Sequence, residues 1–308
     1  MWIFSMISVR IKNINFKSPI IAASGTFGYG DEVKDFVDLS KVGCIITKSI
    51  TLDERKGNPS PRILDSPSGM INAIGLANVG VEQFCKQKIP SLNLIDTNFI
   101  VSVAGSKIQD YVNVMDRIEK SNGRHVGYEI NISCPNIKKG GMEFGVDENV
   151  TYSLVSKLRK ITDKIIIVKL SPNVTNIEDI ALSVESAGAD AISAINTFVG
   201  LAIDYKTGKM LLNNKYGGVS GPAIKPLALA KVHKIYSQVK IPVIGIGGIT
   251  SFKDVVEFIR VGASMVQVGT LNYRSPSIIE NFNDQLKDFL KYNQINSIAD
   301  LVGNYIER

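Results

Sequence analysis

Polar side chains gather where one apolar run of this sequence ends. The run GYEINIS covers residues 127–133, and Asn131, Cys134 and Asn136 lie in it or just after it. Asparagine is depleted in β-strands, so Asn131 needs a reason to be there. A carboxamide both donates and accepts hydrogen bonds, which suits a cyclic imide or amide such as a pyrimidine ring. We therefore expect a small polar ring to bind at this point.

Cys134 stands in the same segment, directly before a proline, where a loop offers it no apolar face to fill. A thiolate can act as a base when its pKa falls from about 8.5 toward neutrality. The alternative is a thiol that serves as a small buried hydrophobic group. We favour the base for Cys134 and the buried hydrophobic group for Cys44 and Cys85.

Glycines end two apolar runs late in the chain. GIGG at 245–248 is followed by Thr250 and Ser251, and the last run ends in Gly269 and Thr270. Glycine lets backbone N–H groups approach an anion closely, and a helix N-terminus adds the positive end of a dipole. The pattern predicts a phosphate site. Tight turns, with helix capping by Thr250 or Ser251, are the alternative.

Further polar side chains end or interrupt other apolar runs. Lys48 ends the second run, Asn196 and Thr197 end the sixth, and Lys169 lies inside the fifth. A buried ammonium needs an anionic or strongly polar partner. A reduced flavin ring would be such a partner for Lys169, and a structural ion pair is the alternative. The loop at 72–78 adds two more carboxamides and a tight turn.

Eight short apolar runs must position these groups. They lie at 19–24, 43–48, 99–105, 127–133, 164–171, 189–196, 241–248 and 263–270. They are rich in Ile and Val and alternate little, as do strands of a parallel sheet that is buried on both faces. Amphipathic segments predict helices at 79–89, 107–121, 148–162, 176–187, 223–238, 251–261 and 275–291. Eight strand–helix units predict an α/β fold, the (β/α)8 TIM barrel.

No change of composition and no linker divides the chain, so we expect residues 1–308 to form a single domain. Longer insertions at 49–78 and 197–222 fall between a strand and the next helix. We expect them to be loops at the carboxyl end of the strands, which is where TIM-barrel active sites lie.

Composition excludes several classes of protein. The 308 residues are 44% apolar and 21% charged, and the net charge of +6 is spread without basic runs, which argues against nucleic-acid and membrane binding. The three widely spaced cysteines argue against a disulfide framework or an iron–sulfur cluster and suit a reducing cytoplasm. No His/Asp/Glu cluster has metal-ligand spacing, so we expect no metal site. The two histidines, His125 and His233, are expected at the surface, which disfavours a hydrolase. Translation starts at Met1 or Met6.

A set of motifs in fixed order resembles one enzyme family. The motifs are TKSITLDERKGNPSPRI (47–63), GMINAIGLANVGVEQF (69–84), INISCPN (130–136), VKLSPN (168–173), INTFVGLAID (195–204), GGVSGPAIKPLAL (217–229), IPVIGIGGI (241–249) and VQVGT (266–270). Together they resemble class 1 dihydroorotate dehydrogenases over about residues 8–303. The resemblance implies FMN, one per subunit, in the barrel mouth, with orotate stacked on the flavin.

The resemblance also implies residue roles. Cys134 would be the catalytic base, where class 2 enzymes have serine, with Lys48 and Lys169 assisting. The substrate would be held by Lys48, Asn72, Ala73, Ile74, Gly75, Leu76, Asn131, Asn136, Asn196 and Thr197. FMN would be held by Ser24, Lys48, Ser49, Ser102, Asn131, Lys169, Ile195, Gly221, Gly247, Gly248, Gly269 and Thr270. Ser102 departs from the family pattern, which has asparagine there, so a shorter hydroxyl faces the cofactor.

The segments GMINAIGL and SGPAIKP look closer to subclass 1B than to 1A. That subclass implies a homodimer joined to a partner subunit with FAD and a 2Fe–2S cluster, in a heterotetramer that passes electrons to NAD. The alternatives are a fumarate-dependent 1A enzyme, a flavin-dependent reductase of pyrimidines or of dihydrouridine in tRNA, and a flavin-binding scaffold without turnover. A dihydrouridine synthase would be expected to have a C-terminal helical RNA-binding domain. We expect this chain to end near the barrel, at Arg308, which disfavours that alternative.

Overall fold

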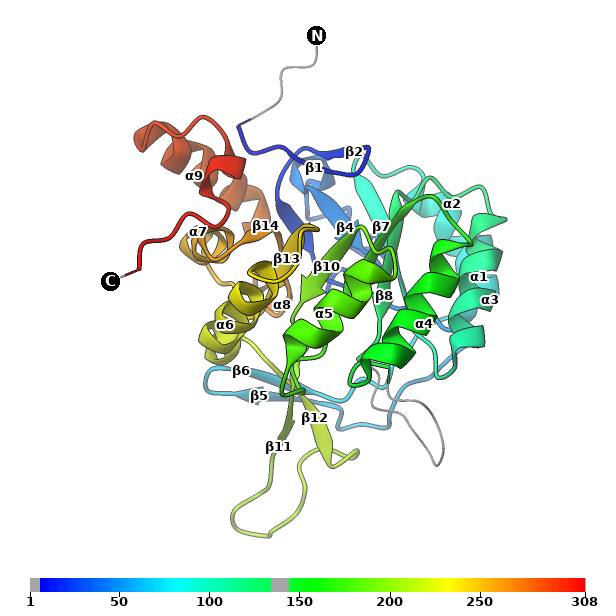
Figure 1. Cartoon of the computed structure of the whole chain (residues 1–308). Helices are drawn as coiled ribbons and strands as arrows, with labels where there is room; N and C mark the ends of the chain where they lie inside the picture. Colours follow the sequence, from blue (N-terminus) through cyan, green and yellow to red (C-terminus); the bar gives the residue numbers. More distant parts are fainter. Residues whose placement is uncertain (1–5, 134–143, 308) are drawn as a thin grey trace.

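The computed structural model describes residues 6–133 and 144–307, and eight parallel strands close into a barrel (Figure 1). The strands are β3 (Ile20–Ala22), β4 (Cys44–Ile46), β7 (Asn98–Val103), β8 (Gly127–Asn131), β9 (Ile165–Lys169), β10 (Ala191–Ala194), β13 (Val243–Ile246) and β14 (Ala263–Val268). Seven of the eight predicted apolar runs contain one of these strands, and β7 begins one residue before the predicted run at 99–105. The (β/α)8 TIM barrel is confirmed.

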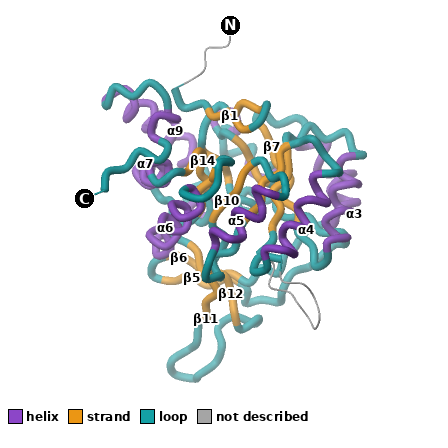
Figure 2. Tube along the Cα trace, in the orientation of Figure 1, coloured by secondary structure: helices purple, strands orange, loops and turns teal. Residues whose placement is uncertain are grey.

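Helices cover the outside of the barrel (Figure 2). The main ones are α3 (Ile108–Glu119), α4 (Glu148–Arg159), α5 (Ile177–Ser186), α6 (Lys225–Tyr236), α7 (Phe252–Arg260) and α9 (Ile278–Tyr292). The segment predicted as one helix at 79–89 is α1 (Gly80–Gln83), a π-helical segment (Phe84–Lys88) and α2 (Ile89–Leu92). Shorter elements are α8 (Leu271–Arg274) and the 3-10 turns Asp31–Val33, Leu39–Lys41, Pro222–Ile224 and Ile298–Leu301. Within the described chain, no helix is both long and apolar enough to cross a membrane.

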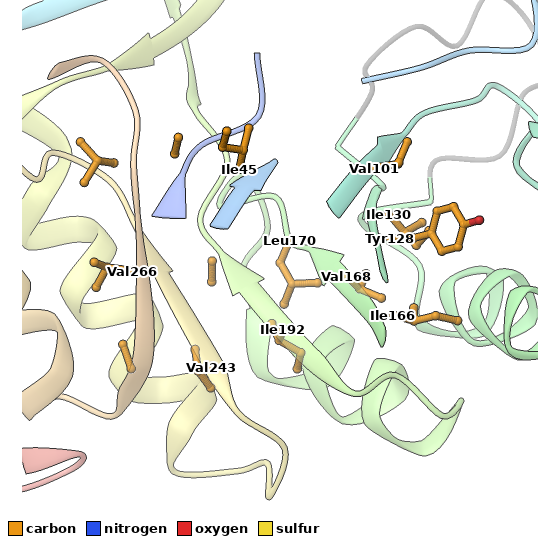
Figure 3. Close-up of a cluster of buried hydrophobic side chains, with 14 of the residues drawn as sticks. Ile45, Val101, Tyr128, Ile130, Ile166, Val168, Leu170, Ile192, Val243 and Val266 are labelled. Atoms are coloured by element: carbon orange, nitrogen blue, oxygen red, sulfur yellow. The ribbon is translucent and has the colours of Figure 1, made fainter. Parts of the chain in front are cut away.

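The strands carry two apolar layers because successive side chains point to opposite faces. One set points outward and packs under the helices, as Ile45, Val101, Val168 and Val266 do (Figure 3). The other set points into the barrel and includes Ile21, Ile46, Ile100, Ile167 and Met265. Both sets are almost fully buried, which explains why the runs showed little alternation.

A short hairpin closes the amino end of the barrel. It consists of β1 (Val9–Ile11) and β2 (Ile14–Phe16), which pair antiparallel. Ile11 and Phe16 belong to the same buried cluster as the inward side chains Ile21 and Cys44. Cys44 is completely buried, as the sequence predicted, and burial raises the pKa of its thiol. The floor of the barrel is therefore filled with apolar groups.

The two long insertions contain a second sheet instead of plain loops. Its antiparallel strands are β5 (Ile63–Ser66), β6 (Gly69–Asn72), β11 (Phe198–Leu201) and β12 (Tyr216–Ser220), in the order β11-β12-β6-β5. Figure 1 shows this mouth sheet at the end of the barrel opposite the β1–β2 hairpin. The insertions lie at the carboxyl end of the strands, as expected, but their pairing was not predicted.

The prediction that His125 lies at the surface is wrong. Its side chain is buried, and its Nε2 lies 2.8 Å from the hydroxyl of Tyr128. Tyr128 in turn donates to Glu119 at 2.8 Å, and Lys164 pairs with the same carboxylate at 2.6 Å. A polar cluster between α3 and β8 thus occupies a place where the sequence shows only isolated residues.

Candidate functional site

The inward-facing side chains change character toward the carboxyl end of the barrel. Asn131 pairs in register with Lys169, and Lys169 with Ser193, across β8, β9 and β10. Neighbouring residues in register point to the same face of a parallel sheet. These polar groups therefore stand side by side above the apolar floor. The structure brings together polar groups that the sequence separates widely.

Asn131 lies at the centre of a chain of polar groups. Its Oδ1 accepts from Asn196 Nδ2 at 3.3 Å and from the backbone N–H of Ser133 at 3.2 Å. Its Nδ2 makes a long contact of 3.5 Å to Ser49 Oγ, which lies 2.8 Å from Ser102 Oγ. The two hydroxyls connect Ser102 to the same line of groups. The serine that departs from the family pattern is thus completely buried and bonded to a second predicted site residue.

Lys169 is nearly buried, as predicted, and it has an anionic partner in the chain. Its Nζ lies 3.7 Å from Glu129 Oε1. The other oxygen of Glu129 accepts from Ser193 Oγ at 3.0 Å and from Gln267 Nε2 at 2.6 Å. The structural ion pair that the sequence left open is therefore present. Glu129 and Gln267 were missed, although each is a polar residue inside an apolar run, which is the signal that identified Lys169.

Lys48 follows β4 at the barrel mouth. Within the described residues, its ammonium has no hydrogen-bond acceptor or ion-pair partner, and its backbone N–H donates to Gly28 at 2.8 Å. Burial lowers the pKa of this half-buried side chain, and Glu32 acts in the opposite direction. Ser24 nearby donates to the carbonyl of Thr47 at 2.9 Å. Lys48 therefore carries an unpaired positive charge at the barrel mouth, which suits the binding of an anionic ligand.

The ends of β13 and β14 form a cradle of backbone groups. Across the part of the chain that is described, the N–H groups of Gly247, Gly248, Gly269 and Thr270 donate to no protein group. Gly247 and Gly248 have φ of 133° and 71°, a region that favours glycine. A Cβ on Gly248 would lie 2.9 Å from the carbonyl oxygen of Gly221. Unpaired N–H groups facing a tight glycine loop suit a phosphate.

Helix capping is present beside this cradle as well. Ser251 Oγ accepts from the N–H of Asp254, and Asp254 Oδ2 accepts from the N–H groups of Thr250 and Ser251 at 2.8 and 2.9 Å. Lys225 is bonded to Asp254 at 2.6 Å, so its ammonium is already paired. The two interpretations of the glycine segment are therefore compatible, because Gly247 and Gly248 are left free.

The mouth sheet fixes the loop that carries several predicted substrate contacts. Asn72 Nδ2 donates to the carbonyl of Gly218 at 3.3 Å. The carbonyls of Ala73 and Ile74 both accept from Asn58, at 2.7 and 2.9 Å. Gly75 and Leu76 follow with positive φ of 80° and 56°. The loop is thus folded tightly against its own insertion.

Asn78, the second carboxamide of this loop, makes structural hydrogen bonds. Its Oδ1 accepts from the N–H of Thr51 at 3.2 Å, and its Nδ2 donates to Thr51 Oγ1 at 2.8 Å. A group paired in this way has little capacity left for a ligand.

Asn196 and Thr197 leave β10 beside Ile195, which is buried. Asn196 Oδ1 accepts from the N–H of Thr197 at 2.8 Å, and Asn173 Nδ2 donates to the Thr197 carbonyl at 3.1 Å. Thr270 Oγ1, from the end of β14, donates to Ser220 at 2.8 Å. Asn173 orients this segment and was missed, although it lies within the VKLSPN motif.

Two predicted site residues, Cys134 and Asn136, lie outside the described residues. The described part of the chain holds no group of three or more His, Cys, Asp or Glu side chains that could bind a metal ion. Cys85 is only partly buried and packs against the hydrophobic core, as the sequence predicted for a small hydrophobic group, and its Sγ lies 3.9 Å from the carbonyl oxygen of Arg117.

The family model described as dihydroorotate dehydrogenase matches residues 6–290. The chain belongs to the dihydroorotate dehydrogenase family. Within this family, the chain is 46% identical over 300 residues to a protein of Geotalea uraniireducens, covering 97% of this chain and 98% of the relative. It is 45% identical to a protein of Bacteroides thetaiotaomicron, covering 96% and 98% of the two chains. Both relatives are named dihydroorotate dehydrogenase B (NAD(+)), catalytic subunit.

A protein of Malacoplasma penetrans with the same name is 46% identical over 297 residues, covering 96% of this chain and 97% of the relative. These relatives of the dihydroorotate dehydrogenase family span almost the whole chain. The family resemblance seen in the sequence motifs is therefore confirmed, and the similarity includes both insertions of the mouth sheet.

Proposed function

We propose that this chain is the catalytic subunit of a class 1B dihydroorotate dehydrogenase, which oxidises dihydroorotate to orotate in pyrimidine biosynthesis. The observation that carries the proposal is the convergence of Lys48, Lys169, Asn131 and Asn196 with a glycine cradle at one end of the barrel. The names of the relatives agree with this activity.

The residues present fit FMN. The free N–H groups of Gly247, Gly248, Gly269 and Thr270 would receive its phosphate, with Gly221 packed below. Lys169 would face the flavin ring, and Ser24, Lys48, Ser49, Ser102, Asn131 and Ile195 would complete the cofactor set. When bound, FMN supplies an acceptor for a hydride.

The substrate groups follow from the remaining side chains. Lys48 offers an unpaired ammonium to the carboxylate of dihydroorotate. Because the side chain is half-buried, this charge-assisted hydrogen bond would be stronger than one at the surface. Asn72, Asn131, Asn136, Asn196 and Thr197 would bond to the ring amides and carbonyls, with the backbone from Ala73 to Leu76 along one edge. A ring fixed in this way is held ready for reaction.

Cys134 would take the proton from C5 of dihydroorotate. The carbon–hydrogen bond at C5 breaks, its electron pair forms the new ring double bond, and a hydride departs from C6. Lys169 would stabilise negative charge that develops on the cofactor side. The Asn131–Asn196 contact holds two of the ring-binding groups in place during this step.

The electrons would leave through a partner. We propose that a subunit with FAD and a 2Fe–2S cluster passes them to NAD, because the relatives are named as NAD(+) catalytic subunits. We also propose that residues 1–308 form one domain and that the chain forms a homodimer within a heterotetramer. The hairpin of β11 and β12 supports an assembly, since Val199, Leu201, Ile203, Tyr205 and Tyr216 on it are all exposed.

The test is to purify the chain alone and together with the subunit encoded as its partner, and to assay both with NAD and with fumarate. Reduction of NAD only in the presence of the partner is the expected result. Use of fumarate by the chain alone would instead identify a class 1A enzyme. A chain that holds no FMN under either condition would contradict the proposal.

A further inference from the structure

One fully buried carboxylate, that of Glu129, lies inside the barrel and has no role assigned above. Glu129 precedes Asn131 by two positions on β8, so both point inward and Glu129 lies nearer the floor. Its side chain is 0% exposed, whereas that of Lys169 is 11% exposed. Lys169 therefore bridges the space between Glu129 and the open mouth.

Three strands besides β8 serve this carboxylate. Ser193 on β10 and Gln267 on β14 donate to Oε2, and Lys169 on β9 faces Oε1. Among the described residues, Oε1 accepts no hydrogen bond, and its only cationic neighbour is Lys169. The Oε1 atom of Gln267 is also buried without a hydrogen-bond partner in the same part of the chain. The negative charge of Glu129 and the positive charge of Lys169 thus neutralise each other.

A buried ion pair is weak evidence of a stabilising role, since apolar residues of the same volume often stabilise a core as well or better. Here Ile167 on β9 lies beside Glu129 in register, and Ile167, Ile244 and Met265 all belong to the buried apolar cluster inside the barrel. The charges appear only where the barrel begins to open. The position of the two charges indicates that they serve the binding site and do not stabilise the fold.

We propose that Glu129 is a positioning residue that holds Lys169 Nζ in place and sets the net charge presented to the flavin ring. This inference rests on the proposed function, in which FMN occupies the mouth. Glu129 acts through Lys169, because the lysine lies between it and the mouth. Neutralising Glu129 leaves the charge of Lys169 uncompensated, and negative charge on the ring then becomes more stable.

Sulfite is a direct probe of this charge in the FMN-loaded protein. Its sulfur lone pair forms a bond to flavin N5, and the negative charge of the adduct resides on the ring beside Lys169. Glu129→Gln keeps the shape of the side chain and removes the charge. We expect this variant to bind sulfite about tenfold more tightly than the parent, measured by loss of flavin absorbance. Glu129→Asp, which retains the charge, should restore parental affinity to within about threefold.

Two controls separate this role from a structural one. Ser193→Ala removes a donor to the same carboxylate but no charge, so its sulfite affinity should stay within about threefold of the parent. In the Lys169→Met background, Glu129→Gln should no longer tighten sulfite binding. Unchanged affinity in Glu129→Gln would overturn the proposal, and so would an equal gain in the Lys169→Met background.

A cofactor-free experiment tests the pair even if Glu129→Gln fails to fold. Among the described residues, the charged or titratable groups that face Glu129 are Lys169 from β9 and Cys44 from β4, and the buried Cys44 thiol stays neutral because burial raises its pKa. In Lys169→Met the carboxylate is buried without a cation, which makes its charged form costly in the folded state. The urea midpoint of this variant, relative to the parent, should rise as the pH falls from about 8 to about 6.

The double variant Lys169→Met/Glu129→Gln should lose that pH dependence. A parental pH profile in Lys169→Met would overturn the inference without involving FMN. A different outcome is that the parent chain binds no FMN while Lys169→Met and the double variant show the expected pH dependence. That outcome would contradict the proposed function and the flavin part of the inference, and only the ion pair between Glu129 and Lys169 would stand.

Discussion

The thiol of Cys134 is the single group on which the proposed proton transfer depends. Cys134→Ala leaves the glycine cradle and Lys169 untouched, so the protein should retain yellow FMN. Turnover should fall by about a hundredfold or more, because a positioned base typically contributes that much. Stopped-flow reduction by dihydroorotate measures the effect. Parental rates in this variant would remove the base assignment.

Glu119 is the centre of the buried polar cluster behind β8. It accepts from Tyr128 and Thr162 and pairs with Lys164 at 2.6 Å. Glu119→Gln should lower the free energy of unfolding by roughly 1–3 kcal/mol, since it weakens several charge-assisted bonds at once. The matched control is Glu82→Gln, which breaks an exposed pair with Arg117 and should cost about 0.5 kcal/mol or less. Urea unfolding of both variants decides the comparison.

The same cluster predicts a pH dependence. Burial lowers the pKa of His125 in the folded state, so the unfolded chain binds its proton first as the pH falls. Stability should therefore decrease below about pH 6.5, by at most about 1.4 kcal/mol per pH unit. Burial raises the pKa of Glu119, but His125, Lys164 and the hydroxyl partners together lower it below its usual value, and this adds a further loss of stability at more acidic pH. His125→Gln should flatten the first phase, and a steep phase that persists in that variant would contradict the assignment.

At the scale of elements, the sequence predicted all eight barrel strands and the main helices because both follow from apolar periodicity. The mouth sheet was not predicted, since its strands are half-exposed and the pairing of β12 with β6, which joins the two insertions, connects residues more than a hundred positions apart. Asn131, Lys48 and Lys169 were found because polar residues stand out in apolar runs. Glu129 shows the same signal, but only its packing against Lys169 reveals its significance.

The loop after β13 can be tested by adding one methyl group. A Cβ on Gly248 would lie 2.9 Å from two backbone atoms, and φ is 71°. Gly248→Ala should weaken FMN binding about tenfold or more, as measured by fluorescence titration of cofactor-free protein. Gly208→Ala is the matched control, because Gly208 has φ of 70° but nothing within 4 Å of the added carbon. Equal FMN affinity in the two variants would count against the phosphate cradle.

At the scale of the whole molecule, the β11–β12 hairpin projects from the mouth sheet (Figure 1). Ile203 and Tyr205 on it are 50% and 87% exposed. If this face is covered in the homodimer, Ile203→Ser/Tyr205→Ser should shift the chain to monomer in sedimentation velocity. Tyr292→Ser is the control, because Tyr292 is 89% exposed at the end of α9. An unchanged sedimentation coefficient in the double variant would place the interface elsewhere.

The hairpin of β1 and β2 has a further consequence for turnover. Because Ile11, Phe16 and the inward residues of the strands fill the amino end, the described residues leave the carboxyl end as the route by which a molecule reaches Asn131. Dihydroorotate then enters and orotate then leaves through the same end of the barrel, one molecule at a time. Orotate should accordingly compete with dihydroorotate for the same binding site, and each orotate must be released before the next dihydroorotate binds.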